Sequence, residues 1–422
     1  MAPMGLSIEL NDELCACAKG PRNLITDVPG VRVGHVTLEG DSPAGPLHTG
    51  VTAIVPPGDC FTDKLPAAAY VSNGFGKSMG LVQVEELGSL ETPIFMTNTL
   101  SCGACFDALV RYSLDRHSAI GVETGTVNPV IMECNDGPIN TIRAMAVTAD
   151  HGLEAIDAAA GDFAEGAVGA GAGMTCFGLK GGIGSASRVL TFDGRDFTVG
   201  VLVLTNFGSL ACLRIAGRAI GRELARVGLP ERPREEPSQS ALTGRLVGSA
   251  RHALGNSREA DDASHAIDAR HAIETPDKGS IVAVIATDLP VDSRQLKRMA
   301  KRVTVGIARC GGYIGNGSGE IVVAFSTANR IPHWAGETHA GEVNSSEAHS
   351  GDMGKPSPMI DRVERLSDNA MDACFRAVAS ASEEAIVSSL WHAHSVVGRD
   401  GRTTWSLCDA ASHAGIPLES IS

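Results

Sequence analysis

Short apolar runs, each bounded by glycine, proline or polar residues, are the clearest hydrophobic pattern in this chain. The runs at 199–204 and 281–286 are continuous and only six residues long, which predicts strands buried on both faces. Residues 25–37 alternate apolar and polar positions around a Pro-Gly turn, and 49–58 form a second such stretch closed by prolines, so both predict hairpin strands. Residues 310–327 predict a glycine loop that runs into another buried strand.

Helical spacing of apolar residues appears in four longer segments: 150–164, 214–227, 292–309 and 361–394, the last as one helix or two. In the first of them, Leu153, Ile156 and Ala160 fall on one face of a helix. Helices therefore accompany the predicted strands, and the pattern indicates a mixed α and β fold.

Two polar segments interrupt this pattern. Residues 230–278 are rich in Arg, Glu, Ser and His and lack the apolar density for a core, so we interpret them as an insert. Residues 328–358 form a second irregular stretch, rich in Gly, Ser and His. No internal repeat of fixed period is found.

Composition favours a compact enzyme. The 422 residues are 43% hydrophobic, and the net charge of -14 argues against non-specific binding to nucleic acid. The apolar runs fall well short of the roughly 18–20 residues of a membrane span. The amino terminus lacks a basic segment followed by an apolar one, so no signal peptide is predicted. Eleven cysteines, an odd number, fit reduced thiols, and the expected compartment is the cytoplasm.

The junction Gly279-Ser280 joins the polar insert directly to the apolar run 281–286. A strand that starts with a small hydroxyl residue behind a glycine is typical of self-cleaving hydrolases with an N-terminal nucleophile. Cleavage before Ser280 would free an α-amine, whose typical pKa of about 7.7–8.0 suits a general base beside the hydroxyl. The alternative is that Gly-Ser is only a turn before a buried strand.

The stretch Gly76-Lys77-Ser78 suggests two other kinds of site. It resembles the end of a phosphate loop, but Val71 stands where that loop needs glycine. Gly76 to Gly80 also spell GxSxG, the nucleophile elbow of α/β-hydrolases, with Ser78 as the nucleophile. That elbow needs a tight strand-to-helix turn, whereas Ser72-Asn73-Gly74 is expected to break the strand.

Metal and redox sites have weaker support. Cys102 and Cys105 form a lone CxxC without a second pair, and His392 and His394 are the only close histidine pair. His339 and His349 lie in the second polar segment. The glycine-dense run 166–184 contains no GxGxxG in register, so its glycines are expected to let backbone pass close to neighbouring elements or to line a cleft.

Several separate blocks together resemble one family, the DmpA-type L-aminopeptidase/D-esterase family of self-processing serine peptidases, which also contains the β-peptidyl aminopeptidases. The resemblance covers most of the chain and lies in the blocks 34–40, 72–101, 129–140, 171–188, 199–208, 279–290, 316–329 and 383–403. It implies an αββα sandwich, shared with ornithine acetyltransferase and the nylon-oligomer hydrolases. The fold class expected is therefore α+β, with a fragment 1–279 and a fragment 280–422 in one sandwich.

The resemblance also implies roles for single residues. Ser280 matches the new amino-terminal nucleophile, and Ser318 and Glu320 match a serine and a carboxylate that hydrogen-bond around it. Asn206 matches an amide that stabilises the oxyanion, and Glu133 matches a carboxylate that receives the substrate's amino group. Without the resemblance, a loop or strand-end hydrogen bond would be the simpler interpretation of each.

The chain departs from the family pattern near 133–140, where a tyrosine usually assists the oxyanion. The chain has only Tyr70, Tyr112 and Tyr313, so either Asn135 takes that place or the role is vacant. The insert 230–278 is also longer than the pattern suggests.

The function expected is a serine aminopeptidase that releases N-terminal residues from small peptides, amides or esters through an acyl-enzyme. No cofactor or metal, no nucleic acid and no membrane partner is expected, and the resemblance implies a tetramer of processed pairs. Two alternatives remain: acyl transfer as in ornithine acetyltransferase, whose group uses threonine as the nucleophile, and a catalytically impaired binding homologue.

Overall fold

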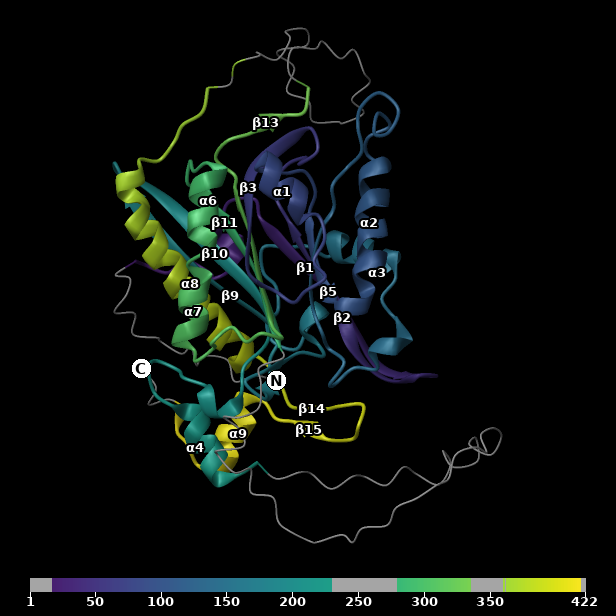
Figure 1. Cartoon of the computed structure of the whole chain (residues 1–422), viewed down its shortest axis with the longest axis vertical. Coiled ribbons are helices and arrows are strands. Elements are labelled where there is room, and N and C mark those ends of the chain that lie inside the picture. Colours follow the sequence, from purple (N-terminus) through teal and green to yellow (C-terminus); the bar gives the residue numbers. More distant parts are fainter. Residues whose placement is uncertain (1–16, 230–278, 335–359, 361, 419–422) are drawn as a thin grey trace.

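A computed structural model describes residues 17–229, 279–334, 360 and 362–418. Within them, two β-sheets pack face to face, and helices cover both outer faces (Figure 1). The larger sheet has the strand order β13-β3-β12-β11-β10-β9, with β4 paired to β3. Its strands are β3 (Asp63–Gly74), β4 (Ser89–Leu90), β9 (Ile183–Phe192), β10 (Arg195–Asn206), β11 (Ser280–Thr287), β12 (Gly319–Ser326) and β13 (Ile331–Pro332).

The smaller sheet has the order β1-β2-β5-β6. Its strands are β1 (Arg32–Ser42), β2 (Gly45–Val55), β5 (Ile94–Asn98) and β6 (Val130–Cys134). Two short hairpins form two-stranded sheets of their own: β7 (Thr175–Cys176) with β8 (Leu179–Lys180), and β14 (Val396–Val397) with β15 (Thr403–Thr404).

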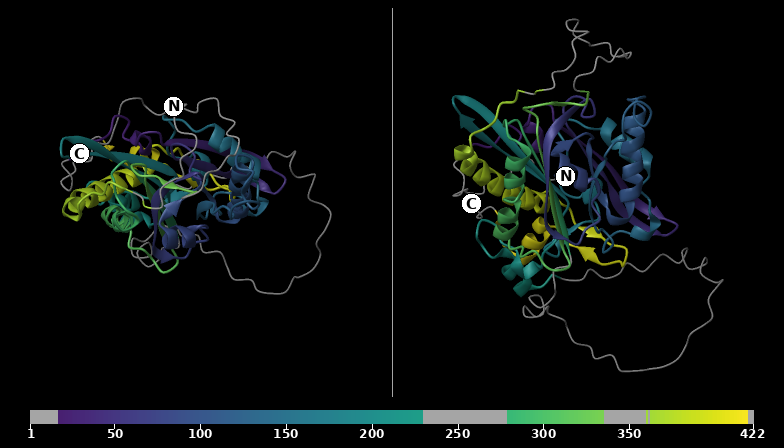
Figure 2. Two further views of the ribbon diagram at one scale, coloured as in Figure 1. Left: turned by 90° about the horizontal axis from the view of Figure 1, so that it is seen from above. Right: turned by 45° about the horizontal axis from the view of Figure 1, so that its top comes forward.

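The two helical layers lie on opposite sides of the sheets (Figures 1 and 2). The outer face of the larger sheet is covered by α6 (Ser293–Ala300), α7 (Val303–Arg309) and α8 (Met371–Trp391), and that of the smaller sheet by α2 (Cys102–Leu114) and α3 (Ala149–Asp157). The remaining elements are α1 (Leu81–Leu87), α4 (Ile220–Val227), α9 (Leu407–Ala414) and the 3-10 turns η1 (Ile25–Asp27), η2 (Thr99–Ser101), η3 (Ile142–Ala144), η4 (Gly169–Gly171), η5 (Leu210–Cys212) and η7 (Asp368–Ala370).

Strand β11 lies between two cores, which explains why its sequence is a continuous apolar run. Val282 and Val284 point into the core between the two sheets, whereas Ile281 and Ala283 point into the core under α6, α7 and α8. All eight residues of β11 are buried, because the strand has apolar neighbours on both faces. The predicted αββα sandwich is confirmed.

Several predicted boundaries were wrong for local reasons. The helix expected over 150–164 ends at Asp157, because Ala160 leaves it to exchange two backbone hydrogen bonds with Val33 of β1. The helix expected over 214–227 starts only at Ile220, because Ala216 and Gly217 adopt left-handed backbone angles in a turn.

The other differences concern how the segments divide. The predicted hairpin strands are confirmed, because β1 pairs antiparallel with β2, but the first of them starts only at Arg32, and 25–27 form the turn η1. The segment 292–309 holds two helices, α6 and α7, whereas the described part of 361–394 holds the long helix α8 after the turn η7. The insert 230–278 lies outside the described residues, as do 335–359.

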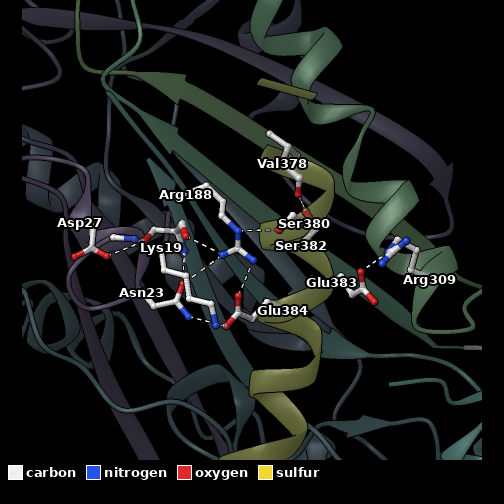
Figure 3. Close-up of polar contacts among 12 residues, drawn as sticks. Lys19, Asn23, Asp27, Arg188, Arg309, Val378, Ser380, Ser382, Glu383 and Glu384 are labelled. Carbon is white, nitrogen blue, oxygen red and sulfur yellow. Dashed lines mark hydrogen bonds and ion pairs between the residues drawn. The ribbon is translucent and has the colours of Figure 1, made fainter. Parts of the chain in front are cut away.

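A buried ion pair joins the amino-terminal segment to the helical layer (Figure 3). Arg188 of β9 donates from Nη2 to Glu384 Oε2 of α8 at 2.6 Å, and their side chains are 2% and 9% exposed. Lys19 Nζ donates to the other oxygen of Glu384 at 2.6 Å, and Asn23 Nδ2 donates to it at 2.8 Å. Residues 19–23 are thereby fixed to α8 by charge rather than by apolar packing.

Candidate active site

The residues expected in the site meet at one end of the larger sheet. Strands β11 and β12 run parallel, so both begin at this end, whereas β10 runs antiparallel to β11 and finishes there. The register places Ser280 opposite Asn206 on one side and opposite Gly319 on the other. Three segments far apart in the sequence therefore bring their polar ends together.

Ser280 is the first residue of β11 and is 9% exposed. Its Oγ accepts a hydrogen bond from the backbone N–H of Gly319 at 3.2 Å. A Cβ atom on Gly279 would lie 2.1 Å from the carbonyl oxygen of Asn206 and 2.5 Å from Phe207 Cα. Glycine is therefore required before Ser280 because the backbone of β10 approaches closely, and not because of a left-handed backbone angle.

The predicted pair Ser318 and Glu320 is brought together at the start of β12. Ser318 is fully buried, and its Oγ lies 2.5 Å from Glu320 Oε1 and 2.8 Å from the Gly315 carbonyl oxygen. A hydroxyl has one hydrogen to donate, so these two acceptors compete for it. Glu320 is 2% exposed, and it belongs to the strand that also presents Gly319 to the Ser280 hydroxyl.

Asn73 of β3 holds the turn that carries Ser318, a role that the sequence did not reveal. Its Nδ2 donates to the carbonyl oxygens of Gly315, at 3.0 Å, and of Ser318. The register pairs Asn73 with Glu320, and a bulge interrupts the pairing of β3 and β12 beside this pair. Asn73 lies within a block that carried the family resemblance, which was the available signal.

The side chain of Asn206 is held at both of its polar atoms. Its Oδ1 accepts from the backbone N–H of Thr175 at 3.0 Å, and its Nδ2 donates to the carbonyl oxygen of Asn135 at 3.0 Å. An amide nitrogen carries two hydrogens, so this bond leaves a second N–H for a ligand. Such a fixed donor next to Ser280 has the character of an oxyanion-binding group.

Glu133 lies on β6, in the smaller sheet, and is 3% exposed. Its Oε1 accepts from the backbone N–H of Lys77 at 2.7 Å, and its Oε2 accepts from Thr99 Oγ1. A Cβ atom on Gly76 would lie 3.5 Å from Glu133 Oε1. Each carboxylate oxygen can accept more than one hydrogen bond, so Glu133 keeps capacity for an ammonium group.

The same short segment links Glu133 to the nucleophile. A Cβ atom on Gly319 would lie 2.9 Å from the Phe75 carbonyl oxygen and 3.2 Å from Ser280 Oγ. Residues 75–77 therefore run from beside Ser280 to the carboxylate of Glu133. The two groups lie near opposite ends of this three-residue segment, although they belong to different sheets.

Asn135 does not direct its side chain at the nucleophile. The residue is exposed, and its Oδ1 accepts from the backbone N–H of Gly137 at 2.9 Å. Its contribution is through its carbonyl oxygen, which holds Asn206. Tyr70 lies on β3 and Tyr112 on α2, and only Tyr313 precedes the turn that carries Ser318.

The structure does not support Ser78 as a nucleophile. Strand β3 continues through Gly74, contrary to the expected break, and accommodates Ser72 by the bulge opposite β12. Ser78 lies in the connection to α1, and its Oγ is buried without a hydrogen-bond partner among the described residues. No base accompanies it there, as a nucleophile elbow requires.

Cys102 and Cys105 lie in the first turn of α2, and neither forms a disulfide. Burial raises the pKa of each thiol to about 12. Such thiols are poor nucleophiles and poor metal ligands near neutral pH. Nine of the described cysteines are outside any disulfide, whereas Cys17 is disulfide-bonded, so the expectation of reduced thiols is wrong at that position.

Histidines and carboxylates do not gather into a metal site within the part of the chain that the structure describes. His392 Nδ1 lies 3.6 Å from Glu165 Oε2, and His339 and His349 lie outside that part. Among the helices described, none has the length and apolar character needed to cross a membrane.

Comparison with known proteins decides the family. The model of peptidase family S58 matches residues 23–404. The chain belongs to peptidase family S58. The β-peptidyl aminopeptidase BapA of Sphingosinicella microcystinivorans is 38% identical over 401 residues, which cover 94% of this chain and 88% of that protein.

Solved structures of two S58-like enzymes have the same fold. A β-aminopeptidase from a Burkholderia species superposes with a TM-score of 0.71 at 35% identity, covering 97% of this chain and 98% of that one. The L-aminopeptidase D-Ala-esterase/amidase of Ochrobactrum anthropi gives 0.71 at 32% identity, covering 94% and 96%. The latter is described as a prototype serine aminopeptidase with a variant of the Ntn hydrolase fold.

The S58 chain is accordingly a self-processing aminopeptidase of the N-terminal-nucleophile type. No observation favours either alternative, the acyltransferase or the catalytically impaired binding homologue. The residues that sequence reasoning missed are those that hold others in place: Asn73, Thr99, Thr175 and the backbone N–H of Lys77.

Proposed function

We propose that the S58 chain cleaves itself between Gly279 and Ser280 and then uses Ser280 as its nucleophile. The Ser280 hydroxyl attacks the Gly279 carbonyl carbon, the acyl group moves from nitrogen to oxygen, and water hydrolyses the resulting ester. This step frees the α-amine of Ser280. The observation that carries the proposal is the position of Ser280, between Asn206 and Gly319 at the first residue of β11.

In turnover, the α-amine accepts the hydroxyl proton while the Ser280 oxygen attacks the substrate carbonyl. The resulting oxyanion receives the second N–H of Asn206, a contribution of about 2.7–4 kcal/mol for one such donor. The proton passes to the leaving amine, and water then hydrolyses the acyl-enzyme. Ser318 and Glu320 hold or relay a proton beside the nucleophile, because their hydrogen bond lies on the neighbouring strand.

We propose small peptides, amides and esters with a free amino end as substrates. Glu133 is the group placed to receive the ammonium, since its carboxylate lies across the three-residue segment from Ser280. The relatives are a β-peptidyl aminopeptidase and an L-aminopeptidase that is also a D-Ala-esterase, so both β- and α-amino substrates belong in the first assays.

The mature protein is proposed to consist of fragments 1–279 and 280–422. Scaling 43.7 kDa by length gives roughly 29 and 15 kDa, which a denaturing gel resolves. Amino-terminal sequencing of the smaller fragment should begin Ser-Ile-Val-Ala. An active protein that remains one full-length chain contradicts the proposal.

The proposed assembly follows the family resemblance, and the proposed location follows the lack of a predicted signal peptide. Processed pairs are proposed to form a cytoplasmic tetramer, in which neighbours limit access to the site to short substrates. Light scattering should then report a particle of about four times 43.7 kDa. A particle of one processed chain, or casein digestion as fast as that of a dipeptide amide, contradicts the assembly and the restricted access.

A further inference from the structure

Lys180 is a fully buried cation whose hydrogens are all taken up by one loop. The residue is 0% exposed. Its Nζ donates to the carbonyl oxygens of Gly171 and Met174, both at 2.9 Å, and of Gly181 at 2.8 Å. An ammonium group has three N–H donors, so these carbonyls use its full capacity. No role in the reaction described above accounts for this arrangement.

The same loop holds the amide of Asn206. Thr175 follows Met174 directly, and its backbone N–H is the group that fixes Asn206 Oδ1 at 3.0 Å. Gly181 N–H also donates to the Met174 carbonyl oxygen at 3.0 Å. Lys180 Nζ therefore links Met174, on one side of the loop, to Gly181, on the other. Met174 directly precedes Thr175, whose N–H holds Asn206.

The end of β10 is attached to this loop as well. Thr205 N–H donates to the Gly182 carbonyl oxygen at 2.9 Å, and Thr205 Oγ1 lies 3.2 Å from the Gly182 N–H. The glycines are required here: a Cβ atom on Gly181 would lie 2.6 Å from Cys176 Cβ, and one on Gly182 would lie 1.9 Å from the Gly166 carbonyl oxygen. The loop, the lysine and the strand end thus form one closely packed unit.

We propose that Lys180 is a positioning residue for the oxyanion-binding amide of Asn206. The inference rests on the proposed role of Asn206. With Lys180 in place, the Thr175 N–H fixes Asn206 Oδ1, and the planar amide must then direct its second Nδ2 hydrogen toward the space beside Ser280. Without the ammonium, the Gly181 carbonyl loses its Lys180 donor, the carbonyls of Gly171 and Met174 each keep only a backbone N–H, and the loop relaxes away from Asn206.

The charge of Lys180 has no carboxylate in contact. Burial lowers its pKa to about 7, and the more distant charges of Glu39 and Asp136 offset only part of this effect. A lysine kept for packing alone would be better replaced by methionine, which carries no desolvation cost. The three carbonyl acceptors therefore account for a lysine at this position better than packing does.

The test compares Lys180→Met, Asn206→Ala and the double variant with wild type in the full-length chain. Each is assayed on the amino-acid p-nitroanilide that wild type hydrolyses fastest, and kcat is expressed per processed chain from intact-mass analysis. Lys64→Met is the matched control, because Lys64 is also a largely buried lysine, although its partner is a carboxylate, Glu91, at 2.5 Å. It lies near the start of β3, at the opposite end of the sheet.

Lys180→Met should lower kcat roughly tenfold to a hundredfold, as displacement of a positioned group does, with KM changed by less than about threefold. In the Asn206→Ala background, Lys180→Met should lower kcat by less than a further factor of about three, because the amide that Lys180 positions is already absent. Lys64→Met should lower the melting temperature and leave kcat unchanged.

Three results would be decisive against the idea. Wild-type kcat in a processed Lys180→Met protein overturns it, and so do fully multiplicative effects in the double variant. Wild-type kcat in Asn206→Ala instead removes Asn206 from the oxyanion role and this inference with it. If Lys180→Met does not fold, Lys180→Gln, which keeps two N–H donors, decides by the same kcat and double-variant criteria.

Discussion

Asn206 and Ser280 face each other as the last residue of β10 and the first residue of β11. In an antiparallel pair, the side chains of opposed residues lie on the same face of the sheet. The register of two core strands therefore sets Ser280 and Asn206, the proposed nucleophile and the proposed oxyanion-binding amide, side by side. A shift of one residue would move one of them to the other face, so catalytic geometry and sheet packing depend on the same pairing.

Replacement of Ser280 tests the nucleophile directly. Ser280→Ala should abolish both cleavage and hydrolysis, because no hydroxyl remains to attack either carbonyl. Ser280→Cys should retain some of either, since a thiol is still a nucleophile. Intact-mass measurement and p-nitroanilide hydrolysis check both effects. Ser78→Ala is the control and should process normally. An active Ser280→Ala protein would contradict Ser280 as the nucleophile and make Ser78 the next candidate.

Glu133→Gln should mainly raise KM, by roughly ten- to a hundredfold, because a charge-assisted hydrogen bond to the ammonium is lost. N-acetylated substrates should be poor for the same reason. Steady-state kinetics on free and acetylated p-nitroanilides measure both effects. Glu91→Gln is the matched control, since Glu91 is also a buried carboxylate, but it lies away from Ser280 and is paired with Lys64. Equal turnover of free and acetylated substrates would contradict the role of Glu133.

Gly279→Ala should stop or strongly slow self-cleavage. The added methyl group would meet the Asn206 carbonyl oxygen at 2.1 Å, and β10 or β11 must shift to make room, at a cost of about 1–3 kcal/mol. The processed fraction over time, measured by mass, checks this. Gly103→Ala in α2 meets nothing within 4 Å and should process like wild type, with slightly higher stability. Normal cleavage of Gly279→Ala would show that this close approach is not required.

Arg188→Met should lower the free energy of unfolding by about 1.5–3 kcal/mol, because Glu384 would lose one buried charge-assisted hydrogen bond while it keeps its pair with Lys19. Denaturant unfolding measures the change. Arg195→Met removes a pair with Glu364 in which both side chains are largely exposed, and should change stability by less than about 0.5 kcal/mol. Equal effects of the two variants would mean that burial of the first pair is unimportant.

Asp136 makes stability depend on pH. Burial raises its pKa from 3.8 to about 6, and the nearby side chains of Thr49 and Asn140 offset only part of that. Between about pH 4 and pH 6 the folded state holds a proton that the unfolded state has lost, so stability falls as pH rises through this window. Above about pH 6, the free energy of unfolding stays lower by about 3 kcal/mol than it would be if the pKa of Asp136 were unshifted.

Asp136→Asn should therefore raise the melting temperature at pH 8 and change it little at pH 4. Thermal unfolding across pH 4–8 gives the profile, and the gap in melting temperature between variant and wild type should grow as the pH rises from about 4 to about 6 and stay constant above pH 6. Asp115→Asn, at an exposed position, is the control and should show no gap. A gap that does not vary with pH would indicate that Asp136 is not the titrating group.

Local pattern was sufficient for the strands of the core. The runs at 199–204 and 281–286 are apolar on both faces, and the structure buries both faces. Helix ends were less predictable, because Ala160 pairs with Val33, a contact more than a hundred residues distant in sequence. Propensity carries no information about such partners.

In the candidate site too, local sequence pattern identified some residues and missed others. A glycine before a serine at the start of an apolar run marked Ser280 from the residues alone, whereas the other roles depended on family resemblance. Asn73 and Lys180 act on backbone carbonyls of a turn and a loop, and such acceptors have no sequence signature. Only the folded backbone shows which carbonyls are within reach.

The cleavage point lies at the edge of a strand that has partners on both sides, β10 from one proposed fragment and β12 from the other. The Ser280 hydroxyl meets the Gly319 N–H and lies opposite Asn206 only after that ladder has formed. In the proposed mechanism, self-cleavage therefore reports completed folding: an immature chain would keep its peptide bond and stay inactive. After the cut, the backbone ladder of β10 and β11 joins the two fragments, which should separate only when the whole sandwich unfolds and should not regain the sheet as isolated pieces.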